Sequence, residues 1–228
     1  MTAIPQTLQG FRDATRVQQS ALAGIEKRCL VWMAHRMPRR VNPDHLTVLG
    51  FAAMCLAGAC YALAHRWPPS LLLVNVCLAV NWFGDSLDGT LARTRQCQRP
   101  RYGFYVDHIV DSFGALFLIC GLALSGYMSW WIAVALLVSF YLLSVNAYLA
   151  TYTLGTFQLS YGKFSPTELR ILLSIGNAAA LLRPNVTVFG MHQRLFDVSG
   201  VVAAVCMAVV LIGSVVRNTI ALYRLERL

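Results

Sequence analysis

The stretch DSLDGTLARTRQCQRPRYGFYVDHIVD, which runs from Asp85 to Asp111, decides the fold and the chemistry predicted for this chain. Its four aspartates lie at the edges of long apolar runs and form two pairs, Asp85 with Asp88 and Asp107 with Asp111. Residues three or four apart share one face of a helix, so each pair is predicted to point one way. Ionised groups at membrane depth are costly and indicate a functional site. If the two helices form an antiparallel hairpin, all four carboxylates meet at one end of it.

Four carboxylates brought together need compensation for their charge. Two unit charges about 4 Å apart interact by about 4 kcal/mol at an effective dielectric constant of 20. Either some of the acids are protonated, or a cation neutralises them. Oxygen ligands suit hard divalent ions such as Mg²⁺, Ca²⁺ or Mn²⁺. Two such ions would balance four acids, and paired ions are a known device of phosphoryl chemistry.

The same stretch carries a family signature. The pattern D-x-x-D-G-x-x-A-R, followed by G-x-x-x-D-x-x-x-D, resembles the signature of the CDP-alcohol phosphotransferases. This chain supplies every fixed position of it: Asp85, Asp88, Gly89, Ala92, Arg93, Gly103, Asp107 and Asp111. The surrounding pattern of apolar runs resembles the family over most of the chain.

This resemblance implies an enzyme of phospholipid synthesis, in which an alcohol attacks a CDP-linked donor, releases CMP and forms a phosphodiester. It implies that Mg²⁺ or Mn²⁺, as two ions, is held by Asp85, Asp88 and Asp107. It implies that Asp111 is the general base on the acceptor hydroxyl and a further metal ligand. The partners implied are a CDP-linked donor and a lipid or small-alcohol acceptor.

The residues predicted to bind the nucleotide or phosphates of the donor are Asn81, Gly89, Arg93 and Gly103. Gly89 would let the nucleotide approach the backbone, because a side chain there would block it. Arg93 would bind a phosphate. Asn81 lies one turn before Asp85, and a hydrogen bond between helices is an equal alternative for it.

Composition agrees with a membrane protein. The chain has 228 residues, of which 57% are hydrophobic and 13% charged, and its mean hydropathy is +0.56. These values are too apolar for an ordinary soluble domain. The net charge of +9 is better explained by basic residues at membrane edges and on anionic lipid than by nucleic acid. The seven scattered cysteines form no C-x-x-C pair, so we expect neither disulfides nor a zinc site.

Six apolar runs predict an all-α integral membrane protein with six transmembrane helices. The runs cover residues 46–64, 70–88, 104–125, 129–153, 168–183 and 197–216. Since a span needs about 20 residues, with a range of about 17–25, the fifth run is marginal. We predict a basic N-terminal segment, 1–44, with an amphipathic helix along the membrane surface within residues 11–35. The six-helix transmembrane domain would follow at 45–228.

Lys and Arg residues predict the orientation of the chain. They are most frequent before residue 44, between the second and third runs, between the fourth and fifth, and near the C-terminus. Both termini and the acidic site should therefore face the cytoplasm, at the inner membrane if the cell is bacterial. Gly121 and Ser125 form a small-residue pair that could pack helices closely, so a homodimer is possible.

Two substrate pairings stay open. One is CDP-diacylglycerol with a small polar alcohol or its phosphate, in which Lys163 and Arg170 would hold the acceptor's anion. The other is a CDP-amino-alcohol with a diacylglycerol-like acceptor, because the run from Thr151 to Thr156 resembles the choline/ethanolamine phosphotransferase branch. The first is slightly favoured, since it is the commoner use of so compact a chain.

Two alternative functions, a cation transporter and a scaffold with an inactive site, are less well supported by the sequence. Intramembrane acids also bind cations in transporters, but such sites tend to lie near the membrane midplane, often at broken helices. Here the acids lie at one end of the predicted helices, and no repeat halves are detectable. A scaffold with an inactive site is disfavoured because every acid of the signature is present.

Overall fold

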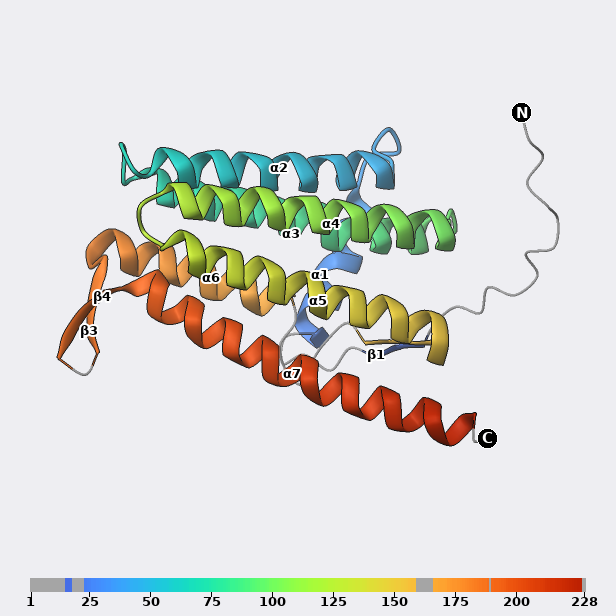
Figure 1. The fold of residues 1–228 in the computed structure, drawn as a ribbon. Coiled ribbons are helices and arrows are strands. Elements are labelled where there is room, and N and C mark those ends of the chain that lie inside the picture. Colours follow the sequence, from blue (N-terminus) through green and yellow to red (C-terminus); the bar gives the residue numbers. More distant parts are fainter. Residues whose placement is uncertain (1–14, 18–22, 159–165, 189, 227–228) are drawn as a thin grey trace, which may run out of the picture.

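The computed structural model describes residues 15–17, 23–158, 166–188 and 190–226. Within these ranges the helices are α1 (Ala23–Arg36), α2 (Pro43–Leu63), α3 (Ser70–Thr94), α4 (Pro100–Leu124), α5 (Trp130–Leu154), α6 (Pro166–Leu182) and α7 (Leu195–Leu225). The strands are short: β1 (Thr15–Val17) pairs in parallel with β2 (Thr156–Gln158), and β3 (Asn185–Val188) forms a hairpin with β4 (Met191–Arg194). Figure 1 shows α2 to α7 running alternately up and down a bundle, with the shorter α1 beside it.

The prediction of an all-α membrane protein is confirmed, but the count of six spans is not. Among the described residues, five helices are long and apolar enough to cross a membrane, namely α2, α3, α4, α5 and α7. The fifth predicted span is α6, which has 17 residues. It packs on α3 and α7 and buries Asn177 and Ala180 within the bundle. The last helix continues to Leu225, beyond the predicted end at residue 216, because its polar C-terminal turns remain helical.

The helix ends follow local signals. Asn42 is the N-cap of α2, Pro43 opens the helix, and the backbone N–H of Asn42 donates to His45 Nδ1 at 3.3 Å. The turn between α4 and α5 places Gly126 at a φ of 77°, and α5 ends at Gly155 with a φ of 65°. Both angles lie in the left-handed region that glycine adopts readily. The chain reverses at Gly126, between α4 and α5, and also at Pro68–Pro69, between α2 and α3.

Glycines bring α2 into backbone contact with α3 and α4. A Cβ atom on Gly84 of α3 would lie 2.5 Å from the carbonyl oxygen of Leu46. A Cβ atom on Gly58 of α2 would lie 2.3 Å from the carbonyl oxygen of Phe117, and one on Gly121 would lie 2.0 Å from that of Gly58. Small residues permit such close helix packing in membranes. Gly121 therefore serves a contact inside the chain and lends no support to the predicted homodimer.

A buried chain of polar side chains ties α2, α3 and α6 together. The hydroxyl of Tyr61 donates to Asn177 Oδ1 at 2.7 Å, and Asn177 Nδ2 donates to Asn75 Oδ1 at 2.7 Å. Asn75 Nδ2 in turn donates to the carbonyl oxygen of Ser174 at 3.1 Å. The main apolar core surrounds these groups and includes Leu71, Leu78, Leu118, Leu122 and Phe196. A satisfied polar network of this kind fixes how the helices sit against one another.

The predicted amphipathic helix is shorter than expected. Residues 15–17 form strand β1 rather than helix, since their backbone pairs with residues 156–158. Residues 11–14 and 18–22, also within the predicted helix, lie outside the described residues. The observed helix, α1, buries Leu30 and Ala34 in a second apolar cluster with Leu46, Leu87 and Leu91. Its other side exposes Trp32. This arrangement holds α1 against the end of the bundle that carries the acids.

Candidate active site

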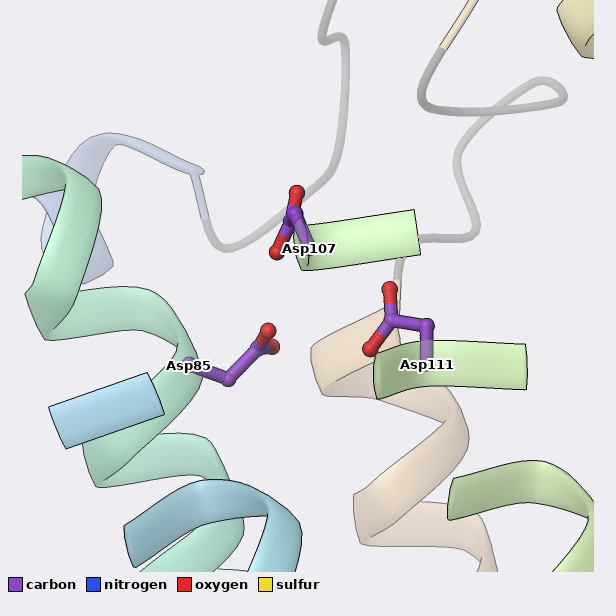
Figure 2. Close-up of side chains that lie close together, drawn as sticks. All are labelled: Asp85, Asp107 and Asp111. Atoms are coloured by element: carbon purple, nitrogen blue, oxygen red, sulfur yellow. The ribbon is translucent and has the colours of Figure 1, made fainter. Parts of the chain in front are cut away.

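Three of the four signature acids converge between α3 and α4. Asp85 comes from α3, and Asp107 and Asp111 come from successive turns of α4. Each offers one carboxylate oxygen, and these oxygens all lie within 4.8 Å of one another. Figure 2 shows the three side chains pointing toward a common space. The predicted hairpin thus brings the acids together, and its arms are held by their common packing on α2.

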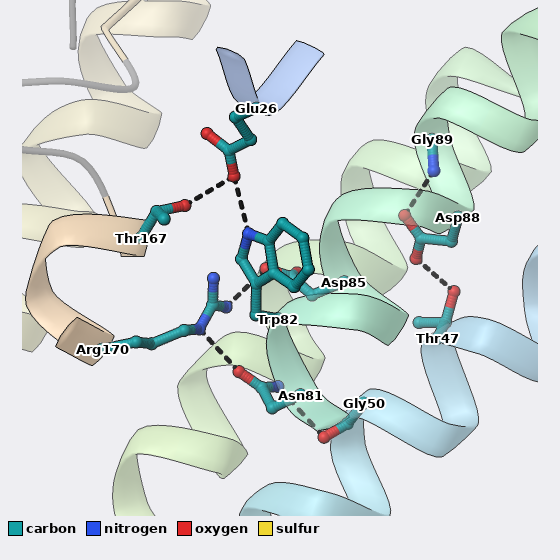
Figure 3. A network of polar contacts seen from close by, with 10 residues as sticks. All are labelled: Glu26, Thr47, Gly50, Asn81, Trp82, Asp85, Asp88, Gly89, Thr167 and Arg170. Carbon is teal, nitrogen blue, oxygen red and sulfur yellow. Dashed lines mark hydrogen bonds and ion pairs between the residues drawn. The ribbon is translucent and has the colours of Figure 1, made fainter. Parts of the chain in front are cut away.

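The fourth acid, Asp88, faces α2. The hydroxyl of Thr47 donates to Asp88 Oδ2 at 2.6 Å, and the backbone N–H of Gly89 donates to Asp88 Oδ1. These two bonds turn the carboxylate toward Thr47 rather than into the three-acid cluster (Figure 3). A carboxylate has about four lone-pair sites, so both oxygens keep acceptor capacity.

Arg170 of α6 reaches the acids from the other side. Its Nη2 atom donates to Asp85 Oδ2 at 2.5 Å, and its Nε atom donates to Asn81 Oδ1 at 2.8 Å (Figure 3). Asn81 is buried, and its Nδ2 atom donates to the carbonyl oxygen of Gly50 at 3.0 Å. Asn81 therefore makes the hydrogen bond between helices, and it also fixes the guanidinium of Arg170 beside Asp85.

The remaining predicted donor-binding residues lie around the acids. A Cβ atom on Gly89 would lie 3.4 Å from Nη1 of Arg93, so this guanidinium covers the glycine one turn away. Arg93 Nη2 also donates to the hydroxyl of Thr90 at 3.1 Å. Gly103 lies one turn before Asp107 on α4, and its Cβ position is open, with no heavy atom within 4 Å. The last predicted residue, Lys163, lies outside the described part of the chain.

A family model decides the kinship of this chain. Residues 40–216 match the model of the CDP-alcohol phosphatidyltransferase family. The chain belongs to this family. The match covers α2 to α6 and most of α7, and therefore every signature residue from Asp85 to Asp111. The prediction drawn from the signature is confirmed at the level of the family, whose members are membrane-embedded transferases.

Two relatives add detail on the family. The chain is 30% identical over 106 residues to the archaetidylinositol phosphate synthase of Pyrococcus horikoshii. That match covers 46% of this chain and 53% of the relative, so the chain spans about half the length of the curated relative it matches. The crystal structure of Mycobacterium tuberculosis phosphatidylinositol phosphate synthase with CDP-DAG bound is similar in fold. Its TM-score is 0.61 at 20% identity, over 84% of this chain and 94% of that one.

The family resemblance in the sequence did not reveal every residue around the site. No sequence motif predicted the hydrogen bond from the hydroxyl of Thr47 to Asp88. Glu26, Trp82 and Thr167 form a second polar group beside Arg170, and no motif predicted it. His108, the residue after Asp107, stacks on Tyr148 with ring centroids 4.9 Å apart.

Proposed function

We propose that this chain transfers a phosphatidyl group from CDP-diacylglycerol to a small polar alcohol or its phosphate. The observation that carries the proposal is the convergence of Asp85, Asp107 and Asp111 from α3 and α4. Such a cluster provides only oxygen ligands, which fit the metal-assisted chemistry of a pyrophosphate donor. Membership of the family supports a CDP-linked donor.

The diacylglycerol ester is the favoured donor. The M. tuberculosis synthase of similar fold holds CDP-DAG, and the P. horikoshii relative is named for the synthesis of an inositol phosphate lipid. Both names describe a lipid built from a polar alcohol that carries phosphate. They support the same pairing here over the CDP-amino-alcohol pairing suggested by residues 151–156.

The donor set fits a hard divalent ion, Mg²⁺ or Mn²⁺. Asp85, Asp107 and Asp111 would hold it, and Asp88 would join them with the oxygen lone pairs that Thr47 and Gly89 leave available. When bound, two such ions supply positive charge against the pyrophosphate and the developing charge on CMP. Arg93, one turn beyond Gly89, would bind a phosphate oxygen of the donor, and the open backbone at Gly103 would leave space for it.

Asp111 is the proposed general base. The oxygen of the acceptor hydroxyl forms a bond to the phosphorus that carries the diacylglycerol ester, while its proton passes to the Asp111 carboxylate. The bond from that phosphorus to the oxygen of CMP breaks, and CMP keeps the electron pair. Asp111 lies one turn further along α4 than Asp107, and its carboxylate faces the space that it shares with Asp85 and Asp107 (Figure 2), where an acceptor hydroxyl would approach it.

Arg170 and Lys163 are the proposed cations for an acceptor phosphate. Arg170 already lies 2.5 Å from Asp85, so an anion bound to its guanidinium would sit next to the acids. The basic segments around α1, after α3 and before α6 support a cytoplasmic position for this end of the bundle. A CDP-linked donor made in the cytoplasm would then reach the site directly.

Purified protein incubated with Mn²⁺ and a panel of donors and acceptors tests the proposal. The panel pairs CDP-diacylglycerol with inositol phosphate, glycerol phosphate, inositol and serine, and pairs CDP-choline and CDP-ethanolamine with diacylglycerol. We expect CMP release with CDP-diacylglycerol and one of the alcohols or alcohol phosphates. Release only from CDP-choline or CDP-ethanolamine would favour the other branch. Cation flux in liposomes without CMP release from any pair would favour a transporter.

A further inference from the structure

We propose that Glu26 of helix α1 is a positioning residue for Arg170, and through it for the acidic cluster. This inference rests on the proposed function for its kinetic consequence, but its structural consequence can be measured separately. It assigns to the N-terminal helix a part in the site in addition to contact with the membrane.

Glu26 accepts two hydrogen bonds from two different helices. Its Oε1 atom accepts from Trp82 Nε1 of α3 at 2.8 Å and from the hydroxyl of Thr167 of α6 at 2.7 Å. All three side chains are half-buried. Figure 3 shows the carboxylate of Glu26 above the indole of Trp82, with Thr167 to its left. Glu26 thus closes a bridge from α3 to α6 by way of α1.

This bridge runs beside the one that Arg170 makes. Trp82 lies three residues before Asp85 on α3, and Thr167 lies three residues before Arg170 on α6. Residues three apart are neighbours on one helix face. Each donor to Glu26 is therefore one turn from one member of the Asp85–Arg170 pair. Together the two bridges fix both the separation of α3 from α6 and the rotation of α6 about its axis.

The position of Glu26, near the N-terminal ends of two helices, favours a negatively charged side chain. It lies in the first turn of α1, and Thr167 lies in the first turn of α6. A negative charge is stabilised near the N-terminus of a helix, where unpaired N–H groups and the helix dipole are positive. The carboxylate therefore complements the beginnings of two helices, and one of those helices presents Arg170 to the acids.

Variants of Glu26 give the kinetic test. Glu26→Ala removes both contacts, and we expect kcat/KM for CMP release with the alcohol phosphate to fall about ten- to a hundredfold, because small misplacements of a positioned group cost this much. Glu26→Gln keeps an acceptor oxygen and should retain most of the activity. Thr167→Val removes one donor, and combining it with Glu26→Ala should cost less than the product of the two single effects. Arg28→Ala is the matched control, because Arg28 is an exposed charged residue of α1 that lies two positions after Glu26.

A double-mutant cycle distinguishes positioning from general loss of structure. If Glu26 acts through Arg170, Glu26→Ala should have little further effect on kcat/KM for the alcohol phosphate in an Arg170→Lys background. A fall in kcat/KM as large in that background as in the native one would overturn the proposal.

The structural consequence is read without turnover. In protein labelled with ¹⁵N at arginine and tryptophan, the Arg170 Nε–H and Trp82 Nε1–H signals are assigned by Arg170→Lys and Trp82→Phe. We expect both signals to shift in Glu26→Ala and neither to shift in Arg28→Ala. An Arg170 signal unchanged in Glu26→Ala would overturn the positioning role. Absence of CMP release from the native protein with every donor would instead overturn the proposed function and leave this measurement valid.

Discussion

Arg170 of α6 donates to the carboxylate of Asp85 of α3 at 2.5 Å, although the two residues lie 85 positions apart in the sequence. The pair places a fixed cation at the edge of the acidic cluster. It links the residue predicted to receive the acceptor's anion to a residue predicted to hold the metal. Under the proposed function, acceptor binding and metal binding would therefore depend on the same contact.

Arg170→Lys should weaken binding of a phosphorylated acceptor. A lysine ammonium cannot reproduce the planar fork that reaches both Asn81 and Asp85. A lost charge-assisted hydrogen bond costs about 1.5–3 kcal/mol, so we expect KM for the alcohol phosphate to rise about tenfold or more. Steady-state kinetics of CMP release measure this. Arg183→Lys, at the other end of α6, is the control, and equal changes in both variants would contradict the role of Arg170.

Asp85→Asn should weaken binding of Mn²⁺ itself, because it removes one of three converging carboxylates. Titration of free Mn²⁺ by electron paramagnetic resonance measures the affinity without any substrate. Asp44→Asn is the matched control, since Asp44 is an acid at the same end of the bundle that pairs with Arg99 instead. A metal affinity unchanged by Asp85→Asn would exclude this acid as a ligand.

The variant Thr47→Val tests whether the hydroxyl of Thr47 orients the carboxylate of Asp88 for metal binding. Removing the hydroxyl leaves the shape of the side chain but frees one carboxylate oxygen of Asp88. Partners that orient a ligand typically contribute about 10- to 100-fold in metal affinity, so a decrease of this order is expected if Asp88 is a ligand. Thr153→Val, an exposed threonine of α5, is the control. The same Mn²⁺ titration measures the metal affinity of each variant. An affinity unchanged by Thr47→Val would indicate that Thr47 does not orient Asp88 for metal binding.

Asp111→Asn should abolish transfer and leave the donor bound. An amide cannot accept the proton of the acceptor hydroxyl, and a general base contributes about 10²- to 10⁴-fold to the rate. Single-turnover CMP release and equilibrium binding of CDP-diacylglycerol measure the two properties separately. Normal turnover in this variant would remove Asp111 from the mechanism.

Gly58→Ala should destabilise the bundle. The added Cβ would lie 2.3 Å from the carbonyl oxygen of Phe117, which is backbone and cannot move aside alone. Overpacking of this kind costs about 1–3 kcal/mol, and the midpoint of thermal unfolding in detergent should fall by several degrees. Gly213→Ala is the matched control, since its Cβ position in α7 has no heavy atom within 4 Å. Equal unfolding midpoints in the two variants would contradict the close contact.

The parts that the sequence predicts are those encoded within one helix. The spacing of Asp107 and Asp111 places both on one face of α4, and the apolar runs locate the long helices. Contacts between distant segments leave no such trace. Glu26 and Thr167 lie 141 positions apart, and nothing in either neighbourhood predicts their hydrogen bond. Asp88 has the spacing expected of a cluster member, but the hydroxyl of Thr47 on another helix determines where its carboxylate points.

Local sequence patterns also did not predict the short strands or the exact lengths of the helices. Strand β1 has three residues, too few for an alternation of polar and apolar side chains to stand out. Helix α7 continues past the apolar run to Leu225, because polar residues also form helical backbone hydrogen bonds and the apolar pattern alone does not mark the end of the helix. The marginal fifth run became α6, whose place depends on its contacts with α3 and α7.

The backbone contact of Gly58 with Gly121 has a consequence for how a lipid reaches the acids. Helices that touch at their main chains leave no gap between them wide enough for an acyl tail. The seam between α2 and α4 is therefore sealed on the side of the bundle where these glycines meet. Under the proposed function, a diacylglycerol substrate would therefore enter from the surrounding bilayer along another flank, with its head group turned toward Asp111.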